Sequence, residues 1–179
     1  MIAIRSSVVP VLVCASALAW AAFGNAQPPA ASGTVTVDAA KVAVTTAAAV
    51  SYPGAGGQLV SVLLSDKPAN AKSFAEDTRI GAGERYVPGI FEGAWKSQHL
   101  SKALSGVTFT IGPAGQLMTN EFLVGNAFSI DTADLVLEVK TTTPRLTGRI
   151  RTRQPVVDVG TKVGLDATFD VAVGTPGSK

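Results

Sequence analysis

Apolar and polar residues alternate with a period of two along much of this chain. The alternation is clearest over residues 163–173, where Asp166, Thr168 and Asp170 lie between apolar side chains. Such a run predicts a β-strand that packs one face on a core and turns the other to solvent. Similar runs predict further strands at residues 34–37, 41–52, 58–65, 107–111 and 135–139.

Turn-forming residues separate these runs. Glycine, proline and threonine cluster at residues 53–57, 112–115 and 142–145. Short connections of this kind join antiparallel neighbours, because a parallel pair needs a much longer crossover. We therefore expect a mainly β protein, folded as a single antiparallel β-sandwich of about seven to nine strands. A partly closed barrel is the alternative, because alternation does not distinguish the two architectures.

The register of one hairpin can be predicted. If residues 142–145 form its loop, three compatible pairs face each other: Asp134 with Arg153, Glu138 with Arg149, and Leu137 with Ile150. A shift of one residue would lose all of these pairs. Arg151 faces Val136 in this register and is the arginine left without a facing acid.

Two short helices are expected between the strands. The first covers residues 68–78, because proline is favoured in the first turn of a helix. The second covers residues 96–104 and stops at Ser105 and Gly106. Residues 79–91 are rich in glycine and show no clear period.

The first 26 residues have the pattern of a signal peptide. Arg5 precedes an apolar stretch at residues 8–23, and small residues lead to an expected cleavage after Ala26. The alternative is an uncleaved membrane anchor. It is disfavoured because the stretch contains Pro10 and has about 16 residues, whereas a spanning helix usually needs about 20.

Cleavage would leave a flexible leader at residues 27–33, one β domain at 34–174 and a tail at 175–179. Cys14 is the only cysteine and lies inside the expected signal peptide. It is not placed as a lipoprotein cysteine would be. A cysteine-free mature protein forms no disulfide and offers no thiolate catalyst or zinc–cysteine site.

Charge gives no reason to expect a nucleic-acid partner. Without Arg5, the 15 basic residues of the chain become 14, against 13 acidic residues. The glycines at 54–57 and 81–83 lack the strand and helix that flank a nucleotide-binding loop, so no cofactor is expected. We expect a periplasmic or secreted protein with no membrane span after cleavage.

Two stretches of the chain are similar to segments of known proteins. They are residues 62–68, and residues 146–152 followed by the strand at 169–171. They resemble segments of small exported bacterial β domains that, as a group, have no assigned activity. The resemblance implies export and a β fold. It supplies no catalytic residue.

His99 is the only histidine. A hydrolase could use it with Ser65 and Asp66, but the chain lacks the Gly-x-Ser-x-Gly turn of a nucleophile. No second histidine or cysteine cluster has metal-ligand spacing, so no metal site is expected. A structural role is favoured over a catalytic one: His99 is expected to pack on Trp95, one helical turn earlier.

A candidate binding surface consists of Tyr86, Trp95, His99 and Arg151. Aromatic residues in an irregular segment can line a ligand surface, or can cover the open end of a sandwich. Arginines 149, 151 and 153 share one strand face and could bind an anion. The favoured interpretation is that Asp134 and Glu138 neutralise two of them across the hairpin, and that Asp166 or Asp170 serves the third from another strand.

The favoured interpretation is an exported, non-enzymatic β module that binds a ligand or an envelope protein through residues 79–95. In that case Trp95→Ala should weaken binding and leave the fold largely intact. The alternatives are a hydrolase that uses His99, and an envelope structural protein that exposes an edge strand for pairing. The oligomeric state is left open.

Overall fold

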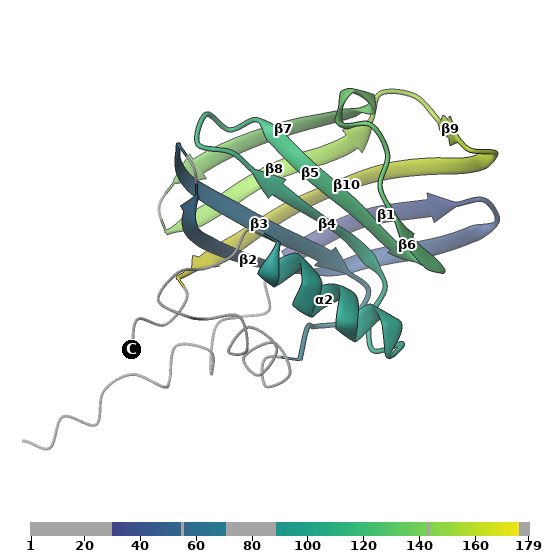
Figure 1. Ribbon diagram of the computed structural model, residues 1–179, viewed down its shortest axis with the longest axis horizontal. Helices are drawn as coiled ribbons and strands as arrows, with labels where there is room; N and C mark the ends of the chain where they lie inside the picture. The colour runs from purple at the N-terminus through teal and green to yellow at the C-terminus, as the bar shows by residue number, and fades with distance from the viewer. Residues whose placement is uncertain (1–29, 55, 71–88, 143, 176–179) are drawn as a thin grey trace, which may run out of the picture.

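The computed structural model describes residues 30–54, 56–70, 89–142 and 144–175 (Figure 1). Its helical elements are α2 (Ile90–Leu100) and a 3₁₀ turn, η2 (Thr132–Asp134). Its strands are β1 (Ala30–Val37), β2 (Ala40–Gly54), β3 (Gly57–Ser65), β4 (Gly106–Ile111), β5 (Leu117–Val124), β6 (Asn126–Phe128), β7 (Leu135–Thr142), β8 (Arg145–Thr152), β9 (Val156–Asp158) and β10 (Thr161–Gly174).

All of these strands belong to one ten-stranded sheet, in the order β6-β5-β4-β3-β2-β1-β10-β8-β7, with β9 paired to β10. The pairings are antiparallel, apart from a short parallel contact between β10 and β2 at Val173 and Ala49. The prediction of a mainly β, antiparallel protein is therefore confirmed. The described strands form one sheet that is not closed into a barrel, and two separate sheets of a sandwich are not observed.

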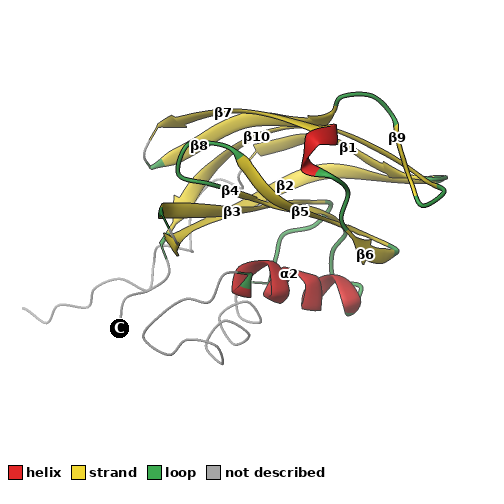
Figure 2. Cartoon of the chain, turned by 45° about the horizontal axis from the view of Figure 1, so that its top comes forward, coloured by secondary structure: helices red, strands yellow, loops and turns green. Residues whose placement is uncertain are grey.

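The sheet folds over on itself around its main core. Phe109 on β4 and Phe169 on β10 are far apart in strand order, yet their ring centroids lie 5.8 Å apart. Figure 2 shows β7, β8 and β10 on one side of the fold and β3, β4 and β5 on the other. The core between them draws on both ends of the sheet, with Val35, Val62, Val107, Phe122 and Ile150 fully buried.

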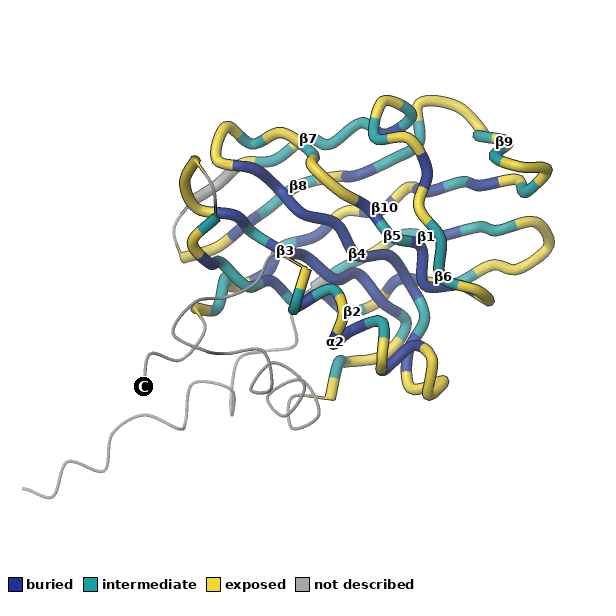
Figure 3. Tube along the Cα trace, in the orientation of Figure 1, coloured by how far each residue is buried: buried dark blue, intermediate teal, exposed yellow. Residues whose placement is uncertain are grey.

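A second, smaller core lies between the sheet and α2. Phe91 and Trp95 on the helix pack with Leu63 on β3 and Leu123 on β5. The strands beneath the helix are therefore covered on both faces, and Figure 3 shows long buried runs along β3 and β4.

The predicted strands are present, with longer boundaries. The hairpin register is confirmed: Leu137 faces Ile150, Glu138 faces Arg149 and Val136 faces Arg151. The sheet also includes β5, β6 and β9, which the alternation did not predict. Strand β1 begins at Ala30, within the segment expected to be a flexible leader.

The boundaries predicted for the second helix were wrong. The helix runs from Ile90 to Leu100, starting after Gly89 in the left-handed region at φ 89°. The glycines of this segment suggested irregular structure, but Phe91, Ala94, Trp95 and Gln98 follow the spacing of one buried helical face. The helix expected at residues 68–78 falls mostly outside the described residues, and 68–70 are not helical. Within the described ranges, no helix is long and apolar enough to cross a membrane.

The turn between β9 and β10 holds a strained residue. Val159 and Gly160 have φ 47° and 85°, the signature of a type I′ turn, and the Val159 side chain is 98% exposed. A β-branched residue is unfavourable in this region, whereas asparagine tolerates it. We expect Val159→Asn to raise the free energy of unfolding by about 1 kcal/mol, measured by urea denaturation. An unchanged or lower stability would contradict the left-handed assignment.

Candidate functional site

The structure separates the residues of the predicted binding surface. Trp95 and His99 lie on α2 and face the sheet, with 1% and 7% of their surface exposed. Arg151 lies on β8, and strands β10, β1 and β2 separate it from the strands beneath the helix. Tyr86 lies outside the described residues. Trp95 and His99 are therefore neighbours in a buried layer, and Arg151 does not join them.

Both ring nitrogens of His99 face carbonyl oxygens. Nδ1 lies 3.0 Å from the Leu104 oxygen and Nε2 lies 2.9 Å from the Gly125 oxygen. The ring thus links the end of α2 to the turn between β5 and β6. Neither nitrogen is directed at Ser65, whose hydroxyl donates to the Lys67 carbonyl at 2.8 Å. The arrangement required for a serine nucleophile with His99 as its base is not assembled.

A carboxylate set among hydroxyl groups lies under the first turn of α2. The Ser61 hydroxyl on β3 donates to Glu92 Oε1 at 2.5 Å, and the Thr110 hydroxyl on β4 donates to the same oxygen. Ser61 and Thr110 are register partners, so the pairing of β3 with β4 places their side chains together. Tyr52 completes the cluster, with its hydroxyl 3.1 Å from Ser61 Oγ.

The Ser61 hydroxyl faces two acceptors. It has one proton, and both Glu92 Oε1 and the Tyr52 hydroxyl oxygen lie within its donating distance, so the proton is shared between them. Burial raises the pKa of Tyr52 above its ordinary value of 10.0, and the Glu92 charge acts in the same direction, so the phenol keeps its proton.

The second carboxylate oxygen of Glu92, Oε2, differs from Oε1 in its hydrogen bonding. Glu92 Oε2 is buried and has no hydrogen-bond partner among the described residues. A buried acceptor without a donor costs about 1–3 kcal/mol, and more when it is charged. Gly89 and Gly93 flank this turn of the helix, and a Cβ added at either glycine would meet no atom within 4 Å. The carboxylate is thus held in place by Oε1 and has an unused acceptor at Oε2.

The rest of α2 makes polar contacts with β5 and with the segment that follows β3. Lys96 pairs with Glu121 on β5 at 2.5 Å. The Gln98 side chain accepts from the Asn70 backbone N–H at 2.8 Å and donates to the Asn70 carbonyl at 3.1 Å.

The arginines of β8 pair with acidic side chains, but in other combinations than predicted. Arg149 binds both carboxylate oxygens of Asp166 on β10, at 2.8 and 2.7 Å, and Arg145 pairs with Asp170 at 2.8 Å. Arg151, for which Asp166 or Asp170 was the expected partner, lies 3.8 Å from Glu138. The prediction that Glu138 neutralises Arg149 was wrong, because the side chains reach diagonal neighbours of the twisted sheet rather than facing ones.

Arg153, expected to pair with Asp134, instead donates from Nε to the Ala133 carbonyl at 2.8 Å. Its backbone N–H donates to the Asp134 carbonyl at 2.8 Å, which places the two residues opposite each other as predicted. The guanidinium groups of Arg149, Arg151 and Arg153 are therefore largely engaged by acceptors of the same chain, and little of this strand face is left to bind an anion.

The ion pair on the outer face predicts a pH effect. The hydrogen bond from Arg149 holds the pKa of Asp166 below its ordinary value of 3.8. At pH values above the ordinary pKa of 3.8, the ion pair therefore stabilises the folded state. This contribution is lost as the pH falls through the lowered pKa that Asp166 has in the folded protein. Asp166→Asn should be less stable than the wild type at neutral pH, and the difference should vanish in strong acid. Urea denaturation across this pH range measures it; Thr168→Val, without a carboxylate, should show no such convergence.

The sequence patterns missed Glu92 because its partners are distant along the chain and meet only through strand pairing. The one available signal was its place three residues before Trp95, on a helix whose start was not recognised. Among the described residues, no group of at least three His, Cys, Asp or Glu side chains could hold a metal ion. No known family model, curated protein or solved structure matches this chain.

Proposed function

We propose that this chain is an exported, non-enzymatic β module that binds a small ligand bearing an ammonium or other N–H donor at Glu92. The observation that carries the proposal is Glu92 Oε2, a buried acceptor without a donor in the described part of the chain. A ligand that donates a hydrogen bond to this oxygen would remove the cost of leaving it unpaired. The signal-peptide pattern of residues 1–26 supports export to the periplasm or beyond.

The chemistry of the cluster favours binding over catalysis. Ser61 donates to a carboxylate that already accepts from Thr110, and no imidazole approaches its hydroxyl among the described residues. A serine nucleophile needs a base that can pass its proton onward. A rigid carboxylate among hydroxyls provides an oriented anionic acceptor, which is what an ammonium group requires.

The test compares the wild type with Glu92→Gln. Methylammonium, ethanolamine and putrescine serve as probes at matched ionic strength, with melting temperature and calorimetric binding as the readouts. The wild type should be stabilised by at least one probe, and Glu92→Gln should lose that response while it keeps its fold. Gln retains an acceptor for Ser61 and Thr110, so the local hydrogen bonds can persist.

Glu121→Gln is the matched control, because it makes the same change in a carboxylate on β5 that already pairs with Lys96. It should keep the probe response. Absence of a response in the wild type, or an equal response in Glu92→Gln, would refute the proposal.

A further inference from the structure

Among the described strands, β7 forms a long edge of the sheet with a neighbour on one side only. It spans eight residues and is the last strand in the order of the sheet, next to β8 only. The strands at the other margins, β6 and β9, have three residues each. Short edge strands, prolines, bulges and charged side chains are the usual protections against edge pairing. Within its described residues β7 has no proline and no bulge, and its only charges, Glu138 and Lys140, have opposite signs and lie on its outer face.

The backbone groups that face this edge can be identified. The Arg153 N–H donates to the Asp134 carbonyl, which makes these residues a hydrogen-bonded pair in the register of β7 with β8. In an antiparallel ladder such pairs recur at every second residue. Val136, Glu138 and Lys140 therefore bond to β8. The N–H and C=O groups of Leu135, Leu137, Val139 and Thr141 point to the free edge.

We propose that the β7 edge binds the β7 edge of a second copy of this chain, in antiparallel pairing centred on Val139. The two sheets would then join into one continuous sheet across a twofold axis. Leu137 would face Thr141 of the second copy. The pairing provides about six main-chain hydrogen bonds between the copies.

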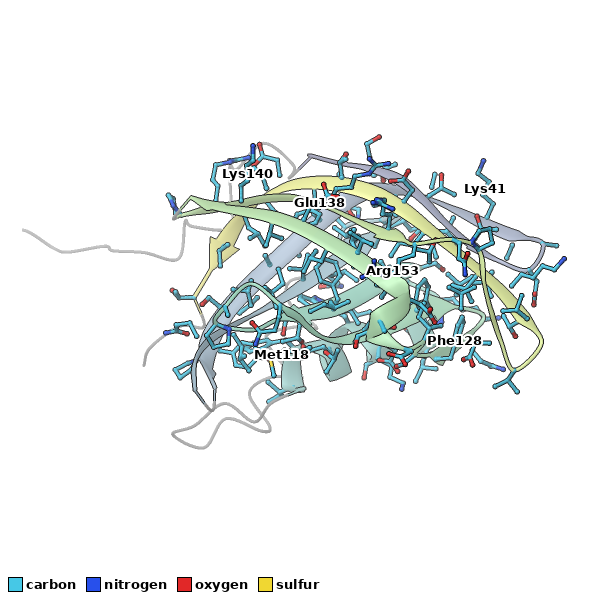
Figure 4. All side chains as sticks on the ribbon, turned by 90° about the horizontal axis from the view of Figure 1, so that it is seen from above. Lys41, Met118, Phe128, Glu138, Lys140 and Arg153 are labelled. Carbon is cyan, nitrogen blue, oxygen red and sulfur yellow. The ribbon has the colours of Figure 1, made fainter. Side chains whose placement is uncertain are left out.

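Charge complementarity selects the second copy and its register. Glu138 and Lys140 are exposed on the outer face of β7 (Figure 4). Glu138 also lies 3.8 Å from Arg151 of its own chain, but 62% of its side chain stays exposed. With Val139 at the centre, each Glu138 faces a Lys140 of the other copy, so two opposite-charge pairs form. A shift of the pairing by two residues in one direction places Glu138 opposite Glu138, and in the other it places Lys140 opposite Lys140. Facing like charges are destabilising, so one register is favoured.

The inner face of the strand fits the same arrangement. Leu137 and Val139 are half-buried and pack at the margin of the main core. The second copy would bring its own Leu137 and Val139 beside them and extend the core across the junction. Because one strand per copy makes a small interface, we expect dimerisation that depends on concentration in the micromolar range.

Sedimentation equilibrium of the full purified chain tests the proposal. The wild type should form a dimer. Glu138→Lys and Lys140→Glu should each raise the dimer dissociation constant about tenfold, since each turns both cross-strand pairs repulsive. The double variant Glu138→Lys/Lys140→Glu should restore dimerisation, because the opposite charges again face each other. Lys41→Glu, a charge reversal on an exposed residue of β2, is the control and should leave the constant unchanged.

A backbone variant separates this edge from other surfaces. Val139→Pro removes an N–H that points to the free edge and not to β8, so the folded monomer should persist while the dimer is lost. Circular dichroism verifies the fold of each variant. A wild type that stays monomeric overturns the proposal, and so does a dimer that is insensitive to the charge reversals and to Val139→Pro.

Discussion

Replacing Trp95 with alanine should lower the free energy of unfolding by about 3–5 kcal/mol, the range for truncating a large buried aromatic side chain. Trp95 is 1% exposed and packs with Phe91, Leu63 and Leu123 between α2 and the sheet. Its removal leaves a cavity in the smaller of the two cores, where few other side chains can move in to fill it.

Denaturation in urea, followed by circular dichroism, measures the effect. Trp95→Phe keeps most of the apolar volume and should cost clearly less. This result would replace the expectation from sequence that Trp95→Ala weakens binding and leaves the fold largely intact. Near-wild-type stability of Trp95→Ala would instead show that the packing of α2 on the sheet is not as described.

The strands that cover the core on one side were predictable from their sequence. Strand β10 and the β7–β8 hairpin have one buried and one exposed face, so their side chains alternate and even their register can be derived. Strand β5 was not predictable in this way. Phe122, Leu123 and Val124 are all buried, since one face meets the main core and the other meets α2.

The candidate site was predictable only in its location. The aromatic and helical residues near Trp95 directed attention to α2, but the chemistry depends on Glu92, Ser61 and Thr110. Ser61 and Thr110 are 49 positions apart and become neighbours through the pairing of β3 with β4. Patterns of local period carry no information on such a pairing. The helix boundary was misjudged for a related reason, because Gly89 and Gly93 lower local helix propensity and tertiary packing overrides it.

Gly106→Ala should be strongly destabilising, by about 3 kcal/mol or more, at the upper end of the cost of overpacking. A Cβ at Gly106 would lie 1.9 Å from the Leu64 carbonyl oxygen and 2.8 Å from Ser65 Cα. Both are backbone atoms of β3, which is held between β2 and β4. The Ser105 N–H also bonds to the Asp66 carboxylate at 2.7 Å, so the two chains cannot separate without breaking further contacts.

This glycine was predicted to end a helix, whereas it begins β4 and allows two backbones to approach closely. Gly93→Ala is the matched control. A Cβ at Gly93 meets no atom within 4 Å, and alanine is favoured over glycine in a helix interior. Gly93→Ala should therefore stabilise the protein by about 0.5–1 kcal/mol. Replacing glycine with alanine should therefore lower the free energy of unfolding at Gly106 and raise it at Gly93. If urea denaturation showed a change in the same direction for both variants, the close approach of β3 and β4 at Gly106 would be contradicted.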